Sequence, residues 1–407
     1  MIQRKTLDNG LRIILEEIPT VRSVTIGIWI KTGSRFETKE ENGISHFIEH
    51  MLFKGTTKRN AQDIAEAFDA IGGEVNAFTS KEYTCLYAKV LDTHQSIAMD
   101  ILADMVLDSL FDPVELEREK KVILEEIHMT NDIPDDIIHD YLSAISFRDH
   151  PLAQPILGNE ENIEAITRDD LLHYMEKYYV PHNIVISIAG NANSDFLEEV
   201  SQHFMHLESK STIPSLTLQQ PIFHQGMYSE EKAIEQAHLA FGFEGLSSKD
   251  KDYYSMVMMN NLLGGGMSSR LFQEIREKQG MAYSIYSFHN SYEDSGLLTI
   301  YAGTSYAMID KAEDQILSII KEMSIDGVSD AELNRSKEQL KGLLLLGLEG
   351  TTSKMSRNAS NEWLYGNVLS VNEELEYIEQ VTREDLERMI ARISEQEPAK
   401  AIILPEK

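Results

Sequence analysis

The residues best suited to chemistry in this sequence are two histidines and a glutamate in the segment GISHFIEHMLFKG. His46 and His50 are four residues apart, and Glu49 directly precedes His50. The apolar residues around them recur at helical spacing, and on a helix of about 3.6 residues per turn, positions four apart share one face. Both imidazoles can therefore reach one metal ion, while the Glu49 carboxylate can approach a metal-bound water without itself binding the metal.

The metal that this ligand chemistry indicates is zinc. Zinc held by two histidines and a carboxylate keeps a fourth position open and lowers the pKa of a bound water to ~7. Such a site produces hydroxide at neutral pH, with Glu49 as the base that activates the water. A solvated polar stripe or a buried hydrogen-bonded pair would also place these residues on one helix face, so the prediction requires a third ligand.

Candidates for the third ligand lie in the segment ELEREKKVILEEIHM, which also has helical spacing. Its acidic residues and histidine are Glu115, Glu117, Glu119, Glu125, Glu126 and His128. Glu119 and Glu126 are seven residues apart and so share a face, whereas Glu125 points about 100° away. Most acidic residues on such a helix are solvent-exposed, and periodicity alone does not choose the ligand.

The elements that must position these residues recur in both halves of the chain, which indicates an internal duplication. The first half is expected to contain a strand, two helices, a β-rich stretch and two long helices, at 24–31, 42–54, 61–71, 74–91, 94–110 and 113–129. The second half repeats this order from about 235, with a helix at 250–263 and a strand at 281–288. AITRDDLLHYM can be laid beside QVTREDLERMI, with Thr167 and Thr382 as helix N-caps.

This order predicts an α+β fold of two homologous α/β sandwich domains, each a mixed sheet with helices packed on it. We predict a catalytic zinc-binding domain at 1–208, a polar linker at 209–221 and a homologous domain without zinc at 222–407. When the halves are aligned, Glu126 falls opposite Leu343, Glu119 falls opposite Ser336, and the histidine helix falls opposite SMVMMNNLL. The second domain therefore lacks the metal, and one zinc ion per chain is expected.

The composition of the chain argues against some classes of protein, namely nucleic-acid-binding and membrane proteins. The chain has 407 residues, enough for about two cores, and a formal net charge of −30. That charge argues against nucleic acid, whose phosphates are bound by surplus Lys and Arg. The acidity can simply keep the protein soluble, and the alternative is that it attracts basic peptides as substrates. No apolar run approaches the ~20 residues of a membrane span. Cys85 is the one cysteine, and no leader precedes the first strand, so no membrane association and a cytoplasmic location are expected.

Four segments resemble the pitrilysin or insulinase family of zinc peptidases, the inverzincins, and within it the half-length members similar to the β subunit of mitochondrial processing peptidase. They are GISHFIEHMLFKGT, GGEVNAFTSKEYT, EREKKVILEEI and LGGGMSSRLFQEIREKQGMAYSIYSF, and the resemblance runs through essentially the whole chain. It implies that Glu126 is the third zinc ligand and that Glu119 supports the site from behind. It implies no role for Glu125.

The resemblance also implies how a substrate is held. An edge strand would accept an extended peptide as a further strand, a mode that reads backbone more than side chains. The residues of that strand are Glu74, Val75, Asn76, Ala77, Phe78 and Thr79. Arg276 and Tyr283 match a spaced pair that reaches the metal site and steadies the reacting carbonyl oxygen. Without the resemblance, these would be an ordinary strand, a surface arginine and a core tyrosine.

A run of three glycines at 264–266 could be mistaken for a phosphate-binding loop. It lacks the following G-K-[ST], so we expect the end of a helix where backbones pack closely.

The resulting hypothesis is a zinc metalloendopeptidase for extended or unfolded peptides, similar to a processing peptidase, with Glu49, Arg276 and Tyr283 as catalytic residues. Long family members carry four such domains, so two identical chains of this length would restore the set, and a homodimer is expected. One alternative is a non-catalytic assembly subunit with the same fold, against which the complete set of four metal-site residues speaks. The other is a metal-dependent hydrolase of a different substrate.

Overall fold

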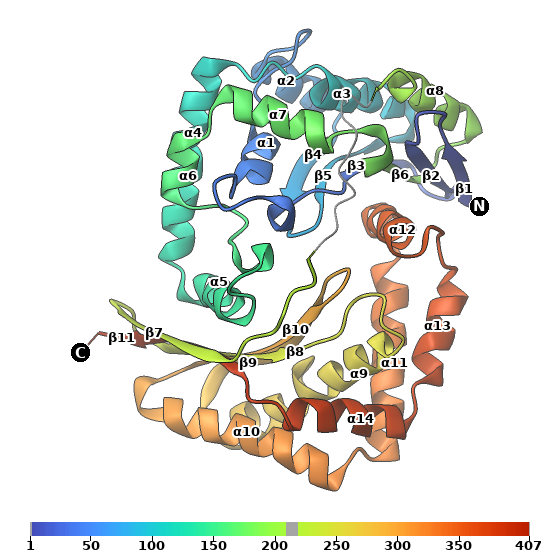
Figure 1. Cartoon of the computed structure of the whole chain (residues 1–407). Helices are drawn as coiled ribbons and strands as arrows, with labels where there is room; N and C mark the ends of the chain where they lie inside the picture. Colours follow the sequence, from blue (N-terminus) through green and yellow to red (C-terminus); the bar gives the residue numbers. More distant parts are fainter. Residues whose placement is uncertain (1, 209–218, 407) are drawn as a thin grey trace. The chain divides into compact units, whose positions relative to one another are not determined.

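The computed structural model describes residues 2–208 and 219–406, which pack into two compact units (Figure 1). The first unit contains the described residues of 2–128, 154–208 and 347–368, and the second contains 129–153, 219–346 and 369–406. Residues 209–218, most of the predicted linker, lie outside the described residues. Because the units are discontinuous in sequence, the boundaries 1–208 and 222–407 of the duplicated halves stay a prediction.

The first unit is built on a six-stranded mixed sheet in the order β1-β2-β6-β3-β5-β4. The strands are β1 (Ile2–Thr6), β2 (Arg12–Glu17), β3 (Ser23–Ile30), β4 (Glu74–Thr79), β5 (Thr84–Leu91) and β6 (Ile184–Gly190). β2 and β6 are parallel, and the other neighbours are antiparallel. β3 and β6 are buried on both faces, in keeping with their nearly continuous apolar sequences. β4 is an edge strand that pairs with β5.

Helices cover one face of this sheet. They are α1 (Ile44–Leu52), α2 (Ala61–Ala70), α3 (Gln95–Leu107), α4 (Pro113–Asn131), α6 (Glu160–Ala165), α7 (Arg168–Tyr178) and α8 (Ser194–Phe204). Phe47 of α1, Leu102 of α3 and Ile28 of β3 belong to one buried cluster. Each such side chain contributes about 1.5–3 kcal/mol by leaving water, so this cluster holds α1 against the sheet.

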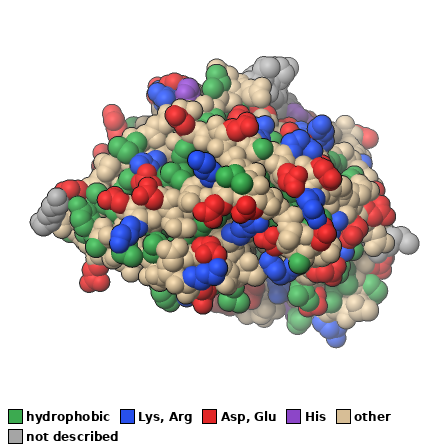
Figure 2. Space-filling model, turned by 90° about the horizontal axis from the view of Figure 1, so that it is seen from below, with side chains coloured by type: hydrophobic (Ala, Val, Ile, Leu, Met, Phe, Trp, Pro, Cys, Tyr) green, Lys and Arg blue, Asp and Glu red, His purple; other side chains and the backbone are tan. Residues whose placement is uncertain are grey.

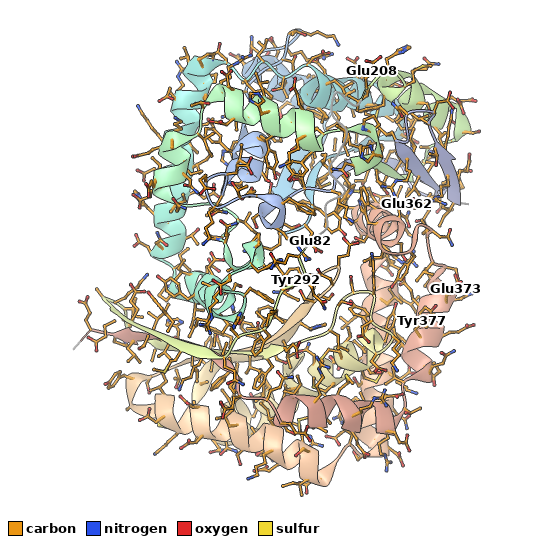
Figure 3. All side chains as sticks on the ribbon, viewed as in Figure 1. Glu82, Glu208, Tyr292, Glu362, Glu373 and Tyr377 are labelled. Atoms are coloured by element: carbon orange, nitrogen blue, oxygen red, sulfur yellow. The ribbon has the colours of Figure 1, made fainter. Side chains whose placement is uncertain are left out.

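The opposite face of the first sheet is covered by α12 (Thr351–Tyr365), a helix from the second half of the sequence. Met355 lies so close to β3 that a Cβ on Gly27 would come within 2.3 Å of its Sδ, and Trp29 Nε1 donates to the same sulfur at 3.0 Å. Farther along the helix lies Glu362, labelled in Figure 3. Its buried carboxylate pairs with Arg4 at 2.5 Å. Shape and charge therefore both fix α12 to this sheet.

The second unit repeats this plan on a five-stranded sheet in the order β7-β11-β8-β10-β9. The strands are β7 (Gly226–Lys232), β8 (Ala237–Glu244), β9 (Ala282–Ser291), β10 (Gly296–Thr304) and β11 (Ala399–Pro405). One face carries α9 (Tyr253–Gly264), α10 (Ile309–Asp326), α11 (Asp330–Gly347), α13 (Val371–Gln380) and α14 (Arg383–Ser394). The other face is covered by α5 (Pro134–Ser146), which comes from the first half of the sequence.

The strand orders of the two sheets correspond, with β1 as an addition to the first. This agreement supports the internal duplication and confirms the predicted α+β fold with mixed sheets. The predicted N-caps are also confirmed, because Thr167 and Thr382 form capping boxes with Asp170 and Asp385. The sequence halves exchange one helix each, α5 and α12, between the units.

None of the helices in the described part of the chain is long and apolar enough to cross a membrane.

Candidate metal centre

Helix α1 carries both histidines, and a buried glutamate outside the helix fixes its first turn. Gly43 precedes the helix with a φ of 101°, in the left-handed region that favours glycine, and cannot cap the helix with a side chain. The carboxylate of Glu37 accepts hydrogen bonds from the amides of Gly43 and Ser45, both at 2.9 Å, and from Asn42 Nδ2 at 3.0 Å. These bonds satisfy amides that a helix start leaves without a partner, so Glu37 anchors the helix that carries the site.

His46, His50 and Glu126 meet at one point, with one potential ligand atom from each within 4.8 Å of the others. Glu126 Oε2 lies 3.7 Å from His46 Nε2 and 3.5 Å from His50 Nε2. Two ligands about 2.1 Å from a tetrahedral zinc ion are ~3.4 Å apart, so these separations match a zinc site. In the described part of the chain, this is the one such cluster of His, Cys, Asp and Glu side chains.

Helix α4 separates the acidic candidates by the direction in which each side chain points. Glu126 is half-buried against the histidines, Glu119 is buried, and Glu125 is exposed. His128 lies on an exposed part of the same helix and approaches Glu160 at 3.3 Å. The pairing of faces expected from helix geometry is therefore present, and tertiary packing brings Glu126 to the histidines.

Glu119 orients His50 from the side opposite Glu126. Its Oε2 lies 3.0 Å from His50 Nδ1, so the Nδ1–H can donate and leave the Nε2 lone pair free for a metal. Its Oε1 lies 2.7 Å from Lys54 Nζ. Burial alone would raise the pKa of Glu119, but the bonds to His50 and Lys54 outweigh burial and lower it. The carboxylate is therefore an anion that fixes the imidazole ring.

Glu49 sits beside the ligands and is held by the edge strand. Thr79 Oγ1, at the end of β4, donates a hydrogen bond to Glu49 Oε2 at 2.6 Å. Burial raises the pKa of Glu49, and the bond from Thr79 offsets part of that rise. A carboxyl group with a raised pKa is suited to accept a proton and release it again near neutral pH.

We expect zinc binding to displace about one proton at pH 7. Burial by itself lowers the pKa of His50, but hydrogen bonds to Glu119 and Glu126 outweigh it and raise the pKa to about 9. Burial and the neighbouring His50 lower the pKa of His46 to about 4. Because zinc needs both imidazoles neutral, only His50 must lose its proton, and zinc affinity should rise up to about tenfold per pH unit from pH 6 to 8.

Calorimetry of zinc binding in buffers with different ionisation enthalpies measures this proton release directly. Glu119→Gln serves as the comparison, because a neutral amide supports the His50 imidazolium less and should reduce the number of protons released. Zinc binding without proton release, and with an affinity that does not change between pH 6 and 8, would contradict the charge state assigned to His50.

Strand β4 has the exposure expected of an edge strand that could bind a peptide. Glu74, Asn76 and Phe78 are exposed, while the side chains between them are half-buried. Phe78 packs edge-on against Trp29 with ring centroids 5.4 Å apart, and Ala77 N donates to Asn76 Oδ1 at 2.8 Å. Because β5 occupies one side of the strand, backbone groups on the other side are the ones a peptide could bind.

Arg276 and Tyr283 belong to the second unit, where they contact each other. The Arg276 guanidinium lies 4.8 Å from the centre of the Tyr283 ring and 4.9 Å from that of Phe272, so it stacks on both. Arg276 lies in a π-helical segment, Phe272–Lys278, a rare geometry that is often found at functional sites. Tyr283 is 74% exposed, which excludes a core role for it.

The glycine run 264–266 follows the expectation from sequence. Helix α9 ends at Gly264, and a Cβ there would come within 2.6 Å of the Ser287 amide nitrogen on β9. The glycines therefore end a helix at a close backbone contact.

Two contacts at the site were not expected from the sequence. Sequence predicts only substrate binding for Thr79, but its hydroxyl bonds to Glu49. Lys54 is not among the predicted site residues, yet it pairs with Glu119. The sequence does contain an indication for Lys54, because this residue follows His50 by four positions and so lies on the same helical face. No local pattern connects Thr79 to Glu49, which are 30 residues apart.

Comparison with protein families gives two matches that together span most of the chain. Residues 12–160 match the family described as Insulinase (Peptidase family M16), and residues 165–340 match the Peptidase M16 inactive domain. The second match agrees with the composition of α9, which contains no histidine or glutamate.

Curated relatives and solved structures match the chain over its whole length. The "uncharacterized zinc protease YmxG" of Bacillus subtilis is 50% identical, over 100% of this chain and 98% of the relative. An "uncharacterized zinc protease" of Streptomyces coelicolor is 39% identical, over 99% and 90%. A protease from Helicobacter pylori has a TM-score of 0.92 at 20% identity, over 100% and 99% of the two chains. A peptidase M16 inactive domain from Pseudomonas fluorescens has a TM-score of 0.91 at 20% identity, over 100% and 98%.

Proposed function

The chain belongs to the insulinase family of peptidases, peptidase family M16, and from this premise we propose that it is a zinc-dependent metalloendopeptidase. Its substrates would be extended or unfolded peptides, as for a processing peptidase. The observation that carries the proposal is the spacing of His46, His50 and Glu126 around one point, with Glu49 beside them and outside the ligand set. One zinc ion per chain would be held by these three side chains.

The protein's own groups would then move the protons of the reaction. A bound zinc ion supplies Lewis acidity and lowers the pKa of a coordinated water. Glu49 takes a proton from the water whose oxygen attacks the scissile carbonyl carbon, and then gives that proton to the amide nitrogen as the C–N bond breaks. The products are a carboxylate and an amine. The hydrogen bond from Thr79 would keep the Glu49 carboxylate in place while that carboxylate gains and loses the proton.

The substrate would dock along the open side of β4 as an added strand. This mode requires an extended backbone and tolerates many side chains, which accounts for the proposed preference for unfolded peptides. Arg276 and Tyr283 are proposed to steady the carbonyl oxygen as it becomes negatively charged, through the guanidinium and the phenol hydroxyl. Their mutual stacking supports that role, because an arginine held between two rings has little freedom to lose on binding.

The setting of the enzyme is proposed from composition and chain length. The 67 acidic residues outnumber the 37 basic ones, which favours basic peptides over nucleic acid as partners. On the face shown in Figure 2, side chains of the two signs are interspersed. The buried Cys85 thiol suits the cytoplasm, and a homodimer would bring four domains together as in the long family members.

Removal of the metal tests the proposal directly. The zinc-loaded chain is incubated with a library of unfolded peptides, and cleavage is mapped by mass spectrometry. We expect cleavage to stop when a chelator removes the zinc and to return when one equivalent per chain is added back. The same sequences in stably folded proteins should resist cleavage, because they cannot add to β4. Equal cleavage by the metal-free chain would overturn the proposal.

A further inference from the structure

We infer that Lys54 is a positioning residue of the metal centre, which holds Glu119 in the orientation that presents His50 Nε2 to the metal. The inference rests on the proposed function, since it concerns the same site. Lys54 belongs neither to the proposed ligand set nor to β4.

The two oxygens of Glu119 have separate partners. Oε2 bonds to His50 Nδ1 at 3.0 Å, and Oε1 bonds to Lys54 Nζ at 2.7 Å. A carboxylate group rotates easily about its last torsion angle. A hydrogen bond to one oxygen leaves the plane of the carboxylate free to rotate, whereas hydrogen bonds to both oxygens hold that plane in place. Because His50 takes its orientation from Glu119, fixing this plane also fixes the imidazole ring.

The charges of the site require a cation at this position. The Glu119 side chain is only 5% exposed, and a buried carboxylate without compensation is unfavourable. When His50 binds a metal through Nε2 its ring is neutral, so the hydrogen bond from Nδ1 brings no positive charge. Lys54 can supply that charge: its ammonium reaches Glu119 while 30% of its side chain stays exposed to water.

The second unit offers an internal comparison for the same pair of positions. There, Asn261 of α9 donates to the buried Ser336 of α11 at 2.8 Å, as His50 of α1 does to Glu119 of α4. Both partners are neutral in the second unit. The residue four positions after Asn261 is Gly265, whereas the residue four positions after His50 is Lys54. The lysine is therefore present in the unit that has a buried carboxylate, Glu119. It is absent from the second unit, where Ser336 stands in place of that glutamate.

The test is zinc affinity of the full chain, measured by competition with a chelator of known affinity. We expect Lys54→Met, which keeps the length of the stem and removes the charge, to weaken zinc binding about tenfold, as the loss of an outer partner of a ligand does. Lys54→Arg should restore affinity to within about threefold. Lys58→Met is the matched control. Lys58 is only four residues from Lys54 in the sequence, but it pairs with Asp104 and Asp108 rather than with Glu119.

A second mutation separates positioning from a general loss of stability. In a Glu119→Gln background there is no buried charge to hold, so Lys54→Met should change zinc affinity less than about twofold. The absorption spectrum of bound Co²⁺ should change with Lys54→Met and recover with Lys54→Arg, since it reports ligand geometry. Wild-type affinity in Lys54→Met, or an equal loss in both backgrounds, would overturn the inference. A wild-type chain that binds no zinc would instead overturn the proposed function.

Discussion

Glu49→Gln is expected to lose peptide cleavage by a factor on the order of 10²–10⁴ while the chain keeps its zinc. Glutamine has nearly the same shape as glutamate, and its amide oxygen can still accept the hydrogen bond from Thr79. It cannot take a proton from the attacking water or return one to the leaving nitrogen. Because Glu49 lies outside the ligand set, metal content should stay at about one zinc per chain.

The measurement pairs cleavage rates on unfolded peptides with metal analysis of the same preparations. Glu125→Gln serves as the control, because it makes the same chemical change at an exposed position of a neighbouring helix. Full activity in Glu49→Gln would show that another group carries the proton. Loss of zinc together with activity would show that Glu49 helps to hold the metal.

Glu126→Gln is expected to weaken zinc binding by more than the ~10–100-fold typical for loss of an outer partner, while Glu125→Gln leaves it unchanged. The two residues are adjacent in sequence and have the same chemistry, but only Glu126 places a carboxylate oxygen 3.5–3.7 Å from both histidine nitrogens. A neutral amide oxygen is a poorer ligand for zinc than a carboxylate. The loss of the Glu126 charge also lowers the pKa of His50, which reduces proton competition for that ring, but this gain is smaller than the loss of an anionic ligand.

Zinc affinity of both variants is measured with the same chelator competition, together with their thermal unfolding without metal. The metal-free variants should unfold within a few degrees of the wild type, because Glu126 is half-buried beside its neighbours and carries little of the core. The reverse order of zinc affinities would show that Glu125 is the ligand and that α4 presents a different face to α1.

Local sequence predicted the parts of the site that one helix contains. His46, Glu49 and His50 required only helical spacing, and the face shared by Glu119 and Glu126 followed from the same geometry. The choice among the glutamates did not follow, because it depends on how α4 packs against α1. The hydrogen bond from Thr79 to Glu49 is a tertiary contact of the same kind, made where the end of β4 passes the helix.

The fold was predicted to a similar depth. Alternating and continuous apolar patterns indicated the strands, and the repeated order indicated two equivalent sheets. The exchange of α5 and α12 could not be predicted, because the apolar pattern of an amphipathic helix does not specify which sheet the helix covers. Met355 of α12 contacts β3 through the space left by Gly27, a match of shapes between residues more than 300 positions apart.

The exchanged helices also set the order in which a newly made chain can finish folding. The last strand of the first sheet ends at Gly190, but α12, which covers its second face, ends at Tyr365. At about 5–20 residues per second, a ribosome needs roughly 9–35 s to make the intervening chain. During that interval α12 is not yet complete, so Trp29, Val185 and the residues around them on this face stay exposed to solvent. The nascent protein is therefore most prone to aggregation, and most accessible to chaperones, in the second half of its synthesis.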